Sequence, residues 1–197
     1  SVISFPRAMT MGAVRDENLL IKYGEEIGRQ MKMLGIQMSF APVADINNNP
    51  KNPVIHIRSF GENKYNVARK AILYMTGLKN AGLITVAKHF PGHGDTDTDS
   101  HLDLPVMNHS LQTLDSLELY PFRELIKAGV DGVMVAHLNV PALDPTPGIP
   151  ASLSKRIIDS LLIKELKFKG LVITDAMDMK GVANTGNQPE LALKALM

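Results

Sequence analysis

The chain has 197 residues, enough for one domain with a hydrophobic core, and 45% of them are hydrophobic. Its net charge of +1, without a basic stripe, argues against a nucleic-acid partner, because phosphate contacts need clustered lysines and arginines. The absence of cysteine excludes disulfides, thiolate metal sites and a cysteine nucleophile, and no apolar run reaches the roughly 18 residues of a membrane span.

Helices and strands alternate along the first half of the sequence. Apolar residues recur every three or four positions across 13–34, which predicts an amphipathic helix that ends at Gly35. Residues 36–46 predict a strand that runs into a loop rich in Asn and Pro. The same periodicity predicts a second helix over 65–81, and the apolar run 83–87 predicts a buried strand.

The second half of the sequence repeats this order. A helix is predicted over 121–128, where proline occupies a tolerated position in the first turn, and a strand over 132–136. A further helix over 154–168 begins with a serine cap and precedes a strand over 171–174. Residues 188–197 predict the start of another helix.

Strands separated by helices predict a parallel sheet, and several of these strands end in polar residues: Asp45, Lys88–His89, His137 and Asp175. Such strand ends favour an α/β fold of the (β/α)8 TIM-barrel type. Because a complete barrel takes about 250 residues, we expect residues 1–197 to form one partial barrel domain with four or five βα units. An open doubly wound sheet is the alternative, although its dinucleotide-binding version is weakened by the lack of a G-x-G-x-x-G motif.

Three histidines and three carboxylates lie within the fourteen residues 88–101, which follow the second predicted strand. Three aspartates alternate from Asp95 as in a calcium loop, but the sixth position is Ser100 rather than Gly and the twelfth is Val106 rather than Glu. A zinc site using His93 and His101 lacks a helical spacing that would preorganise the ligands. We therefore predict no metal here.

Acid–base chemistry is a second interpretation of the same loop. Asp99 lies two residues before His101 and could fix its tautomer, as carboxylates do in many catalytic histidine pairs. A solvated acidic loop without chemistry is the third interpretation. At the end of the last strand, Asp175 is a candidate nucleophile or a simple capping acid, and Asp178 is its local competitor.

Two basic residues also stand near strand ends. Lys88 ends a buried apolar run, so its ammonium group must enter a polar cavity or pair with an acid. Arg58 follows a long polar loop, and its position is equally typical of a surface arginine.

Four separated strings resemble one known family. They are KHFPGHG with DSH at 88–94 and 99–101, FAPVAD at 40–45, RSFG at 58–61 and TDAM at 174–177. Together, in this order, they are similar to the signature of family-3 glycoside hydrolases, in the bacterial β-N-acetylglucosaminidase branch.

The resemblance implies a TIM-type barrel and a retaining, two-step hydrolysis of terminal β-linked N-acetylglucosamine without a cofactor. By motif match, Asp175 is the nucleophile, and His101 is the acid/base supported by Asp99 as a dyad. The residues expected to bind the sugar are Arg58, Lys88 and His89.

The same resemblance suggests short saccharides such as muropeptides from peptidoglycan recycling as substrates. A β-glucosidase or β-xylosidase, an N-acetylglucosaminide phosphorylase and an inactive sugar-binding barrel remain as alternatives. The branch also carries an upstream Asp-Gln-Glu-Gly-Gly-like segment that this sequence lacks. We therefore expect a fragment of a longer protein with further domains, and the sequence does not decide between a cytoplasmic and a periplasmic location.

Overall fold

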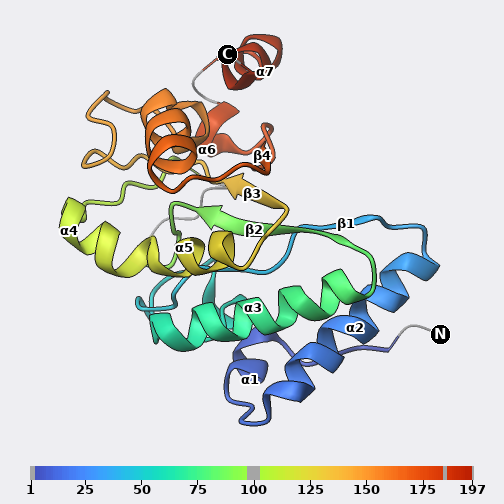
Figure 1. The fold of residues 1–197 in the computed structure, drawn as a ribbon. Helices are drawn as coiled ribbons and strands as arrows, with labels where there is room; N and C mark the ends of the chain where they lie inside the picture. Colours follow the sequence, from blue (N-terminus) through green and yellow to red (C-terminus); the bar gives the residue numbers. More distant parts are fainter. Residues whose placement is uncertain (1–2, 97–102, 184–185, 197) are drawn as a thin grey trace.

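A computed structural model describes residues 3–96, 103–183 and 186–196. Among these residues, four parallel strands form one sheet in the order β1-β2-β3-β4 (Figure 1). The strands are β1 (Met38–Ser39), β2 (Ile84–Phe90), β3 (Gly132–Val135) and β4 (Leu171–Thr174). Because every neighbouring pair of strands is parallel, the carboxyl ends of all four strands lie at the same end of the sheet.

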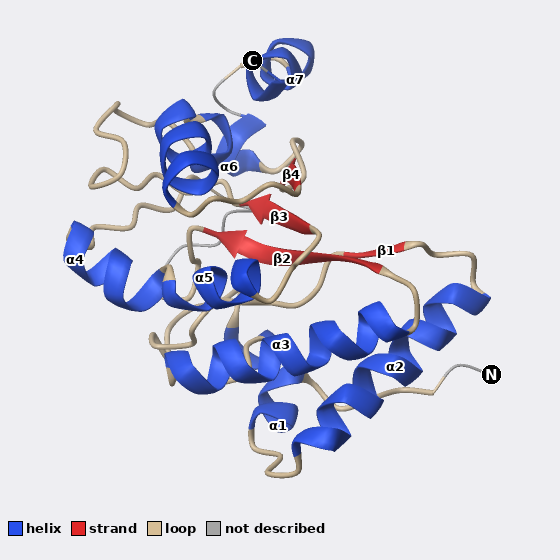
Figure 2. Cartoon of the chain, in the orientation of Figure 1, coloured by secondary structure: helices blue, strands red, loops and turns tan. Residues whose placement is uncertain are grey.

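Helices connect the strands, and α2, α3 and α5 lie along one side of the sheet (Figure 2). Asp16 caps α2 by accepting a hydrogen bond from Asn18, and Asn63 caps α3 in the same way. The described helices are α1 (Ala8–Gly12), α2 (Glu17–Met33), η1 (His56–Arg58), α3 (Lys64–Asn80), α4 (Leu111–Thr113), η2 (Leu114–Glu118), α5 (Tyr120–Lys127), η3 (Ala151–Leu153), η4 (Arg156–Glu165), α6 (Lys180–Ala183) and α7 (Gln188–Leu196).

This alternation confirms the predicted α/β fold, and its parallel strands with helices between them are consistent with part of a TIM barrel. Strand β4 has the predicted bounds, whereas β2 continues three residues beyond the predicted end at residue 87. Lys88 and His89 therefore belong to the strand itself and do not follow it. Strand β1 is shorter than predicted, although hydrogen bonds to β2 continue past its end at Ala41, Pro42 and Ala44.

The predicted helices are confirmed with small shifts at their ends, and α5 begins with Pro121 in its first turn as predicted. Other helical features differ from the prediction, since the short α1, η1, η3 and α6 were not predicted. The helix predicted over 154–168 is the shorter, π-type η4, and a helical segment, α4 with η2, precedes α5 where none was predicted. In that segment Ser110 caps the first turn by accepting a hydrogen bond from the Thr113 N–H.

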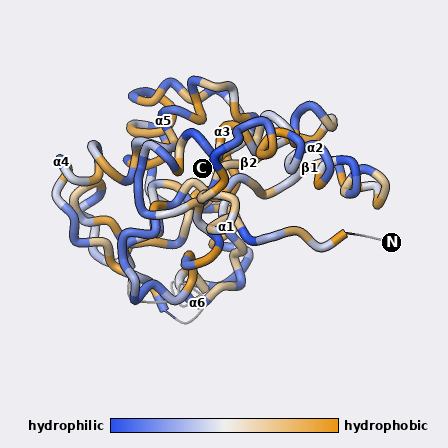
Figure 3. The backbone as a smooth tube through the Cα atoms, turned by 90° about the horizontal axis from the view of Figure 1, so that it is seen from below, coloured by the Kyte–Doolittle hydropathy of each residue, from blue (hydrophilic) through white to orange (hydrophobic). Residues whose placement is uncertain are grey.

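The hydrophobic core lies between the sheet and its covering helices. Hydrophilic and hydrophobic residues alternate along these helices (Figure 3), and the core includes apolar residues of α2, α3 and α5 such as Leu20, Met75 and Phe122. Phe90 of β2 meets Phe122 of α5 edge to face, with ring centroids 5.3 Å apart. In the part of the chain that the structure describes, no helix combines the length and apolar character needed to cross a bilayer.

Candidate active site

The carboxyl ends of the strands carry a buried hydrogen-bonded network centred on Asp45, which follows β1. Its side chain is fully buried, and its Oδ2 lies 2.6 Å from Nδ1 of His89 in β2. Its Oδ1 accepts the backbone N–H of His93 at 2.8 Å. Asp45 therefore ties the loop after β1 to the loop after β2.

The charges in this network determine its protonation. Burial alone would raise the pKa of Asp45, but the charge and hydrogen bonds of His89, with the charge of His93, hold that pKa below its usual value. Burial lowers the pKa of His93, and the charge of Asp45 opposes this effect. The lowered pKa keeps Asp45 an anion at neutral pH.

Arg58 approaches the same network from η1. One guanidinium nitrogen lies 3.4 Å from Nε2 of His89, and another donates to the carbonyl of Val54 at 3.2 Å. Since the Asp45 carboxylate can only accept, the hydrogen in its contact with His89 lies on Nδ1 of the ring. Ser59 fixes the adjoining turn by donating its hydroxyl to the Asp45 carbonyl at 2.7 Å.

Lys88 is half-buried beside these groups. Burial lowers the pKa of its ammonium group, and the nearby charge of Arg58 lowers it further. Asp175 and Asp45 raise it, so both carboxylates act on the same lysine. Two cations and two anions thus converge from η1 and from the ends of β1, β2 and β4.

Asp175 stands directly after β4. Its backbone N–H donates to the carbonyl of Val135 at 2.9 Å, and its Oδ1 accepts the N–H of Ala176 at 2.9 Å. The fully buried His137, at the end of β3, supports this turn: its Nε2 lies 2.9 Å from the Ala176 carbonyl and its Nδ1 2.7 Å from the Ser152 hydroxyl. Asp175 itself is only partly buried, which leaves its carboxylate accessible to a ligand.

The predicted site residues thus fall into two groups. Arg58, Lys88, His89 and Asp175 lie at one edge of the sheet, as predicted, although their roles stay predictions. The predicted dyad, His101 with Asp99, lies outside the described residues.

In the loop after β2, Oδ2 of Asp95 lies 2.8 Å from Nε2 of His109. Both residues line a polar pocket that also contains Asp103. Over residues 3–96, 103–183 and 186–196, no three potential metal ligands of the His, Cys, Asp or Glu type form a group.

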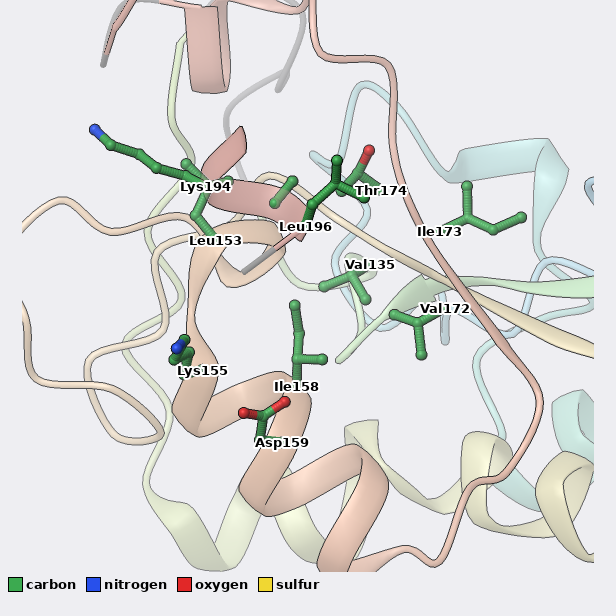
Figure 4. Close-up of a pocket in the computed structure, with 11 residues that line it drawn as sticks. Val135, Leu153, Lys155, Ile158, Asp159, Val172, Ile173, Thr174, Lys194 and Leu196 are labelled. Atoms are coloured by element: carbon green, nitrogen blue, oxygen red, sulfur yellow. The ribbon is translucent and has the colours of Figure 1, made fainter. Parts of the chain in front are cut away.

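A second pocket lies on the far side of β4 and is not part of this network. It opens between β4, η4 and α7 (Figure 4). Val135, Val172 and Ile158 supply apolar walls, and Lys155 and Asp159 stand at its border. None of the residues that line it belongs to the predicted site.

Asp45 and His93 are not among the residues predicted to bind or react. The sequence signal for Asp45 was its place at the end of a predicted strand, which is also the signal that identified Asp175. For His93 the signal was weaker, because a histidine in a Gly-rich loop fits many roles. Only the structure shows that one carboxylate holds both His89 and the backbone of His93.

Comparisons with known proteins place this geometry in a family. Residues 2–197 match the Glycosyl hydrolase family 3 N terminal domain. Beta-hexosaminidase A of Pseudoalteromonas piscicida is 37% identical over 97% of this chain, which covers 34% of that protein. A solved family-3 β-N-acetylglucosaminidase from Paenibacillus sp. is 44% identical, with a TM-score of 0.93, over all of this chain and 37% of that one.

A solved β-glucoside phosphorylase is also similar, with 29% identity and a TM-score of 0.92 over 97% of this chain and 36% of that one. The chain therefore spans about a third of the length of the relatives named here. Since the family match extends over nearly every residue, the chain belongs to glycosyl hydrolase family 3 and represents the N-terminal domain of that family.

Proposed function

We propose that the protein to which this chain belongs hydrolyses terminal β-linked N-acetylglucosamine from short saccharides, with retention of configuration. The observation that supports this most directly is the placement of Asp175 within electrostatic reach of Lys88 at the strand ends of a family-3 chain. A carboxylate beside cations that can grip hydroxyl groups is suited to attack on an anomeric carbon. We also propose that residues 1–197 form a single partial barrel domain.

In the first step, a carboxylate oxygen of Asp175 forms a bond to the anomeric carbon while the bond from that carbon to the leaving oxygen breaks. His101, as imidazolium, gives its proton to the leaving oxygen. In the second step, neutral His101 takes a proton from water, whose oxygen bonds to the anomeric carbon and releases Asp175. Asp99 orients the imidazole in both steps.

The cationic residues hold the sugar during both steps. Lys88 and Arg58 donate charge-assisted hydrogen bonds to sugar hydroxyl groups, and His89 is oriented by Asp45 beside them. Because burial weakens the hydration of Lys88, its bonds to a ligand are stronger than those of an exposed lysine. We propose muropeptides as the substrates, because a muropeptide is a short saccharide that can present a terminal N-acetylglucosamine.

The test is an activity comparison on the full-length protein. An aryl N-acetylglucosaminide should be cleaved with a kcat/KM at least about tenfold above that of the matching aryl glucoside or xyloside. The His101→Ala variant should lose most activity on substrates with poor leaving groups and much less on activated aryl glycosides. Equal loss on both would contradict the acid/base role, and no cleavage of any aryl glycoside would favour a sugar-binding barrel.

Phosphorolysis is a second candidate, and the similarity to a β-glucoside phosphorylase favours it. A histidine acid/base carries no negative charge that would repel an anionic phosphate, unlike a second carboxylate. Product analysis with and without inorganic phosphate separates the two reactions. Sugar 1-phosphate as the main product would replace hydrolysis by phosphorolysis, whereas free sugar in both conditions would support hydrolysis.

A further inference from the structure

Glu118, at the end of η2, is a buried acid that the proposed reaction does not use. Its side chain is 1% exposed. Asn48, in the loop after β1, donates its amide to Glu118 Oε1 at 3.1 Å. Among the described residues, Glu118 Oε2 and Asn48 Oδ1 are each buried without a hydrogen-bond partner. A proton on Glu118 would give this bonded pair the one donor that its two unpaired oxygens lack.

Glu118 also touches the loop after β2. Gly92 has a φ of +130°, and a Cβ at that position would lie 2.7 Å from Glu118 Oε2 and 2.9 Å from its Cβ. Gly94 in the same loop is pressed against the loop after β1, since a Cβ there would lie 1.6 Å from the Ile46 carbonyl oxygen. Glu118 therefore fills the point where these two loops meet, directly behind the Asp45 network.

The charges that face this position make an anion costly. Burial is the largest of the effects that raise the pKa of Glu118 to about 8, the carboxylates of Asp45 and Asp95 add to it, and only the Asn48 hydrogen bond opposes them. Among the described residues, no lysine, arginine or histidine forms an ion pair with Glu118. A neutral carboxyl group satisfies this environment, and its hydroxyl supplies the donor that Asn48 Oδ1 lacks.

We propose that Glu118 is a positioning residue that, in its protonated form, makes a cyclic acid–amide pair with Asn48 and so holds together the two loops that carry Asp45 and His93. In this pair the amide of Asn48 donates to one oxygen of Glu118, and the hydroxyl of Glu118 donates to the amide oxygen of Asn48. The inference rests on the proposed function only for its consequence on substrate binding.

The first test measures the thermal midpoint of the full-length protein against pH for the wild type and Glu118→Gln. The amide of Gln reproduces the cyclic pair with no group that ionises. Wild-type Glu118 loses its proton from about pH 4.5 in the unfolded state but only near pH 8 in the folded state. The midpoint of the variant should therefore exceed that of the wild type by an amount that grows between pH 5 and 8, to about 3 °C or more.

A difference that stays constant with pH, or a variant that is less stable at pH 8, would overturn the proposal. Glu165→Gln, which changes an exposed glutamate on η4, is the matched control and should show no pH-dependent shift. Because this measurement does not involve a substrate, it decides the protonation of Glu118 even when the proposed hydrolysis fails.

The second test concerns the aryl N-acetylglucosaminide. Glu118→Ala leaves Asn48 unpaired and frees the Gly92 loop, so we expect KM to rise about tenfold with a smaller change in kcat. Glu118→Gln should restore KM to within about threefold of the wild type. If both variants lose kcat equally at unchanged thermal midpoint, Glu118 takes part in the reaction and the positioning role is wrong.

Discussion

Asp45 and Asp131 are carboxylates at opposite ends of the same sheet, and the contrast between them separates the reactive end from the supporting end. Asp131, just before β3, accepts the backbone N–H and the hydroxyl of Thr85 and pairs with Lys79 at 2.8 Å. Asp45 likewise accepts from backbone and side chain, but its partners include the ring of His89. Asp131 links α3 to the start of β2, and Asp45 links the loop after β1 to the end of β2.

The two ends differ in burial and in what surrounds the carboxylate. The side chain of Asp131 is 35% exposed, whereas that of Asp45 is 0% exposed. Asp131 pairs with one cation, Lys79, whereas the surroundings of Asp45 include His89 and the two cations Lys88 and Arg58. The carboxyl-end network thus places a buried carboxylate beside two cations, which suits the sugar site that we propose.

The largest effect is expected from Asp175→Ala in the full-length protein. Without the proposed nucleophile, kcat on an aryl N-acetylglucosaminide should fall by about 10⁴-fold or more, while the fold persists because Asp175 is only partly buried. Asp178→Ala is the control, since Asp178 is exposed three residues away and should retain activity within about threefold of the wild type. Comparable losses from the two substitutions would contradict the assignment of Asp175.

Asp45→Asn tests the base of the network and should affect both stability and activity. The amide would direct a donor at the backbone or ring N–H groups of His89, so a buried group loses its partner. We expect a loss of about 3 kcal/mol in the free energy of unfolding, together with a roughly 100-fold fall in kcat/KM through displaced His89. Urea denaturation and steady-state kinetics measure the two effects; normal activity in a destabilised variant would limit Asp45 to a purely structural role.

Much of this contrast is not visible in local sequence patterns. Periodicity predicted α3 and β4 closely, because each depends on residues that are neighbours along the chain. The contact between Asp45 and His89 spans 44 residues and requires β2 to extend through Phe90. A prediction that ends a strand at its last apolar residue cannot detect this extension. Lys88 and His89 are polar residues, yet both belong to β2.

The same reason explains the other residues that sequence patterns missed. Glu118 reads as an ordinary surface acid near the start of a helix, and its burial depends on Gly92 and Asn48, which come from two other loops. The placement of Asp175 was predictable because a carboxylate directly after a buried apolar run marks a strand end in a parallel α/β fold. Contacts within an element are therefore encoded locally, and contacts between strand-end loops are not.

The free energy of unfolding at acidic pH should depend on the buried histidines and not on the exposed ones. Burial lowers the pKa of His93 and of His137 below the usual 6.5, so each takes up a proton less readily in the folded chain than in the unfolded chain. Below pH 6.5 the unfolded chain binds more protons at these histidines than the folded chain does. The free energy of unfolding therefore falls as pH decreases. Each site contributes at most about 1.4 kcal/mol per pH unit.

Urea denaturation between pH 7.5 and 5 measures this slope. His93→Gln should remove the share of one site and leave a shallower dependence, while the exposed His56 serves as the control, because His56→Gln should leave the slope unchanged. A slope that His93→Gln does not alter would mean that His93 is protonated in the folded state at these pH values.

The smallest effect is expected from Asp131→Asn at the opposite end of the sheet. The variant keeps one oxygen for the Thr85 backbone N–H but weakens the pairing with Lys79, so stability should fall by about 1 kcal/mol, reduced further by solvent at this partly exposed site. Activity should stay within about twofold of the wild type, because no substrate-facing group depends on Asp131. A tenfold loss of kcat/KM with unchanged stability would show that the two ends of the sheet are coupled, and the division between a supporting and a reactive end would then be wrong.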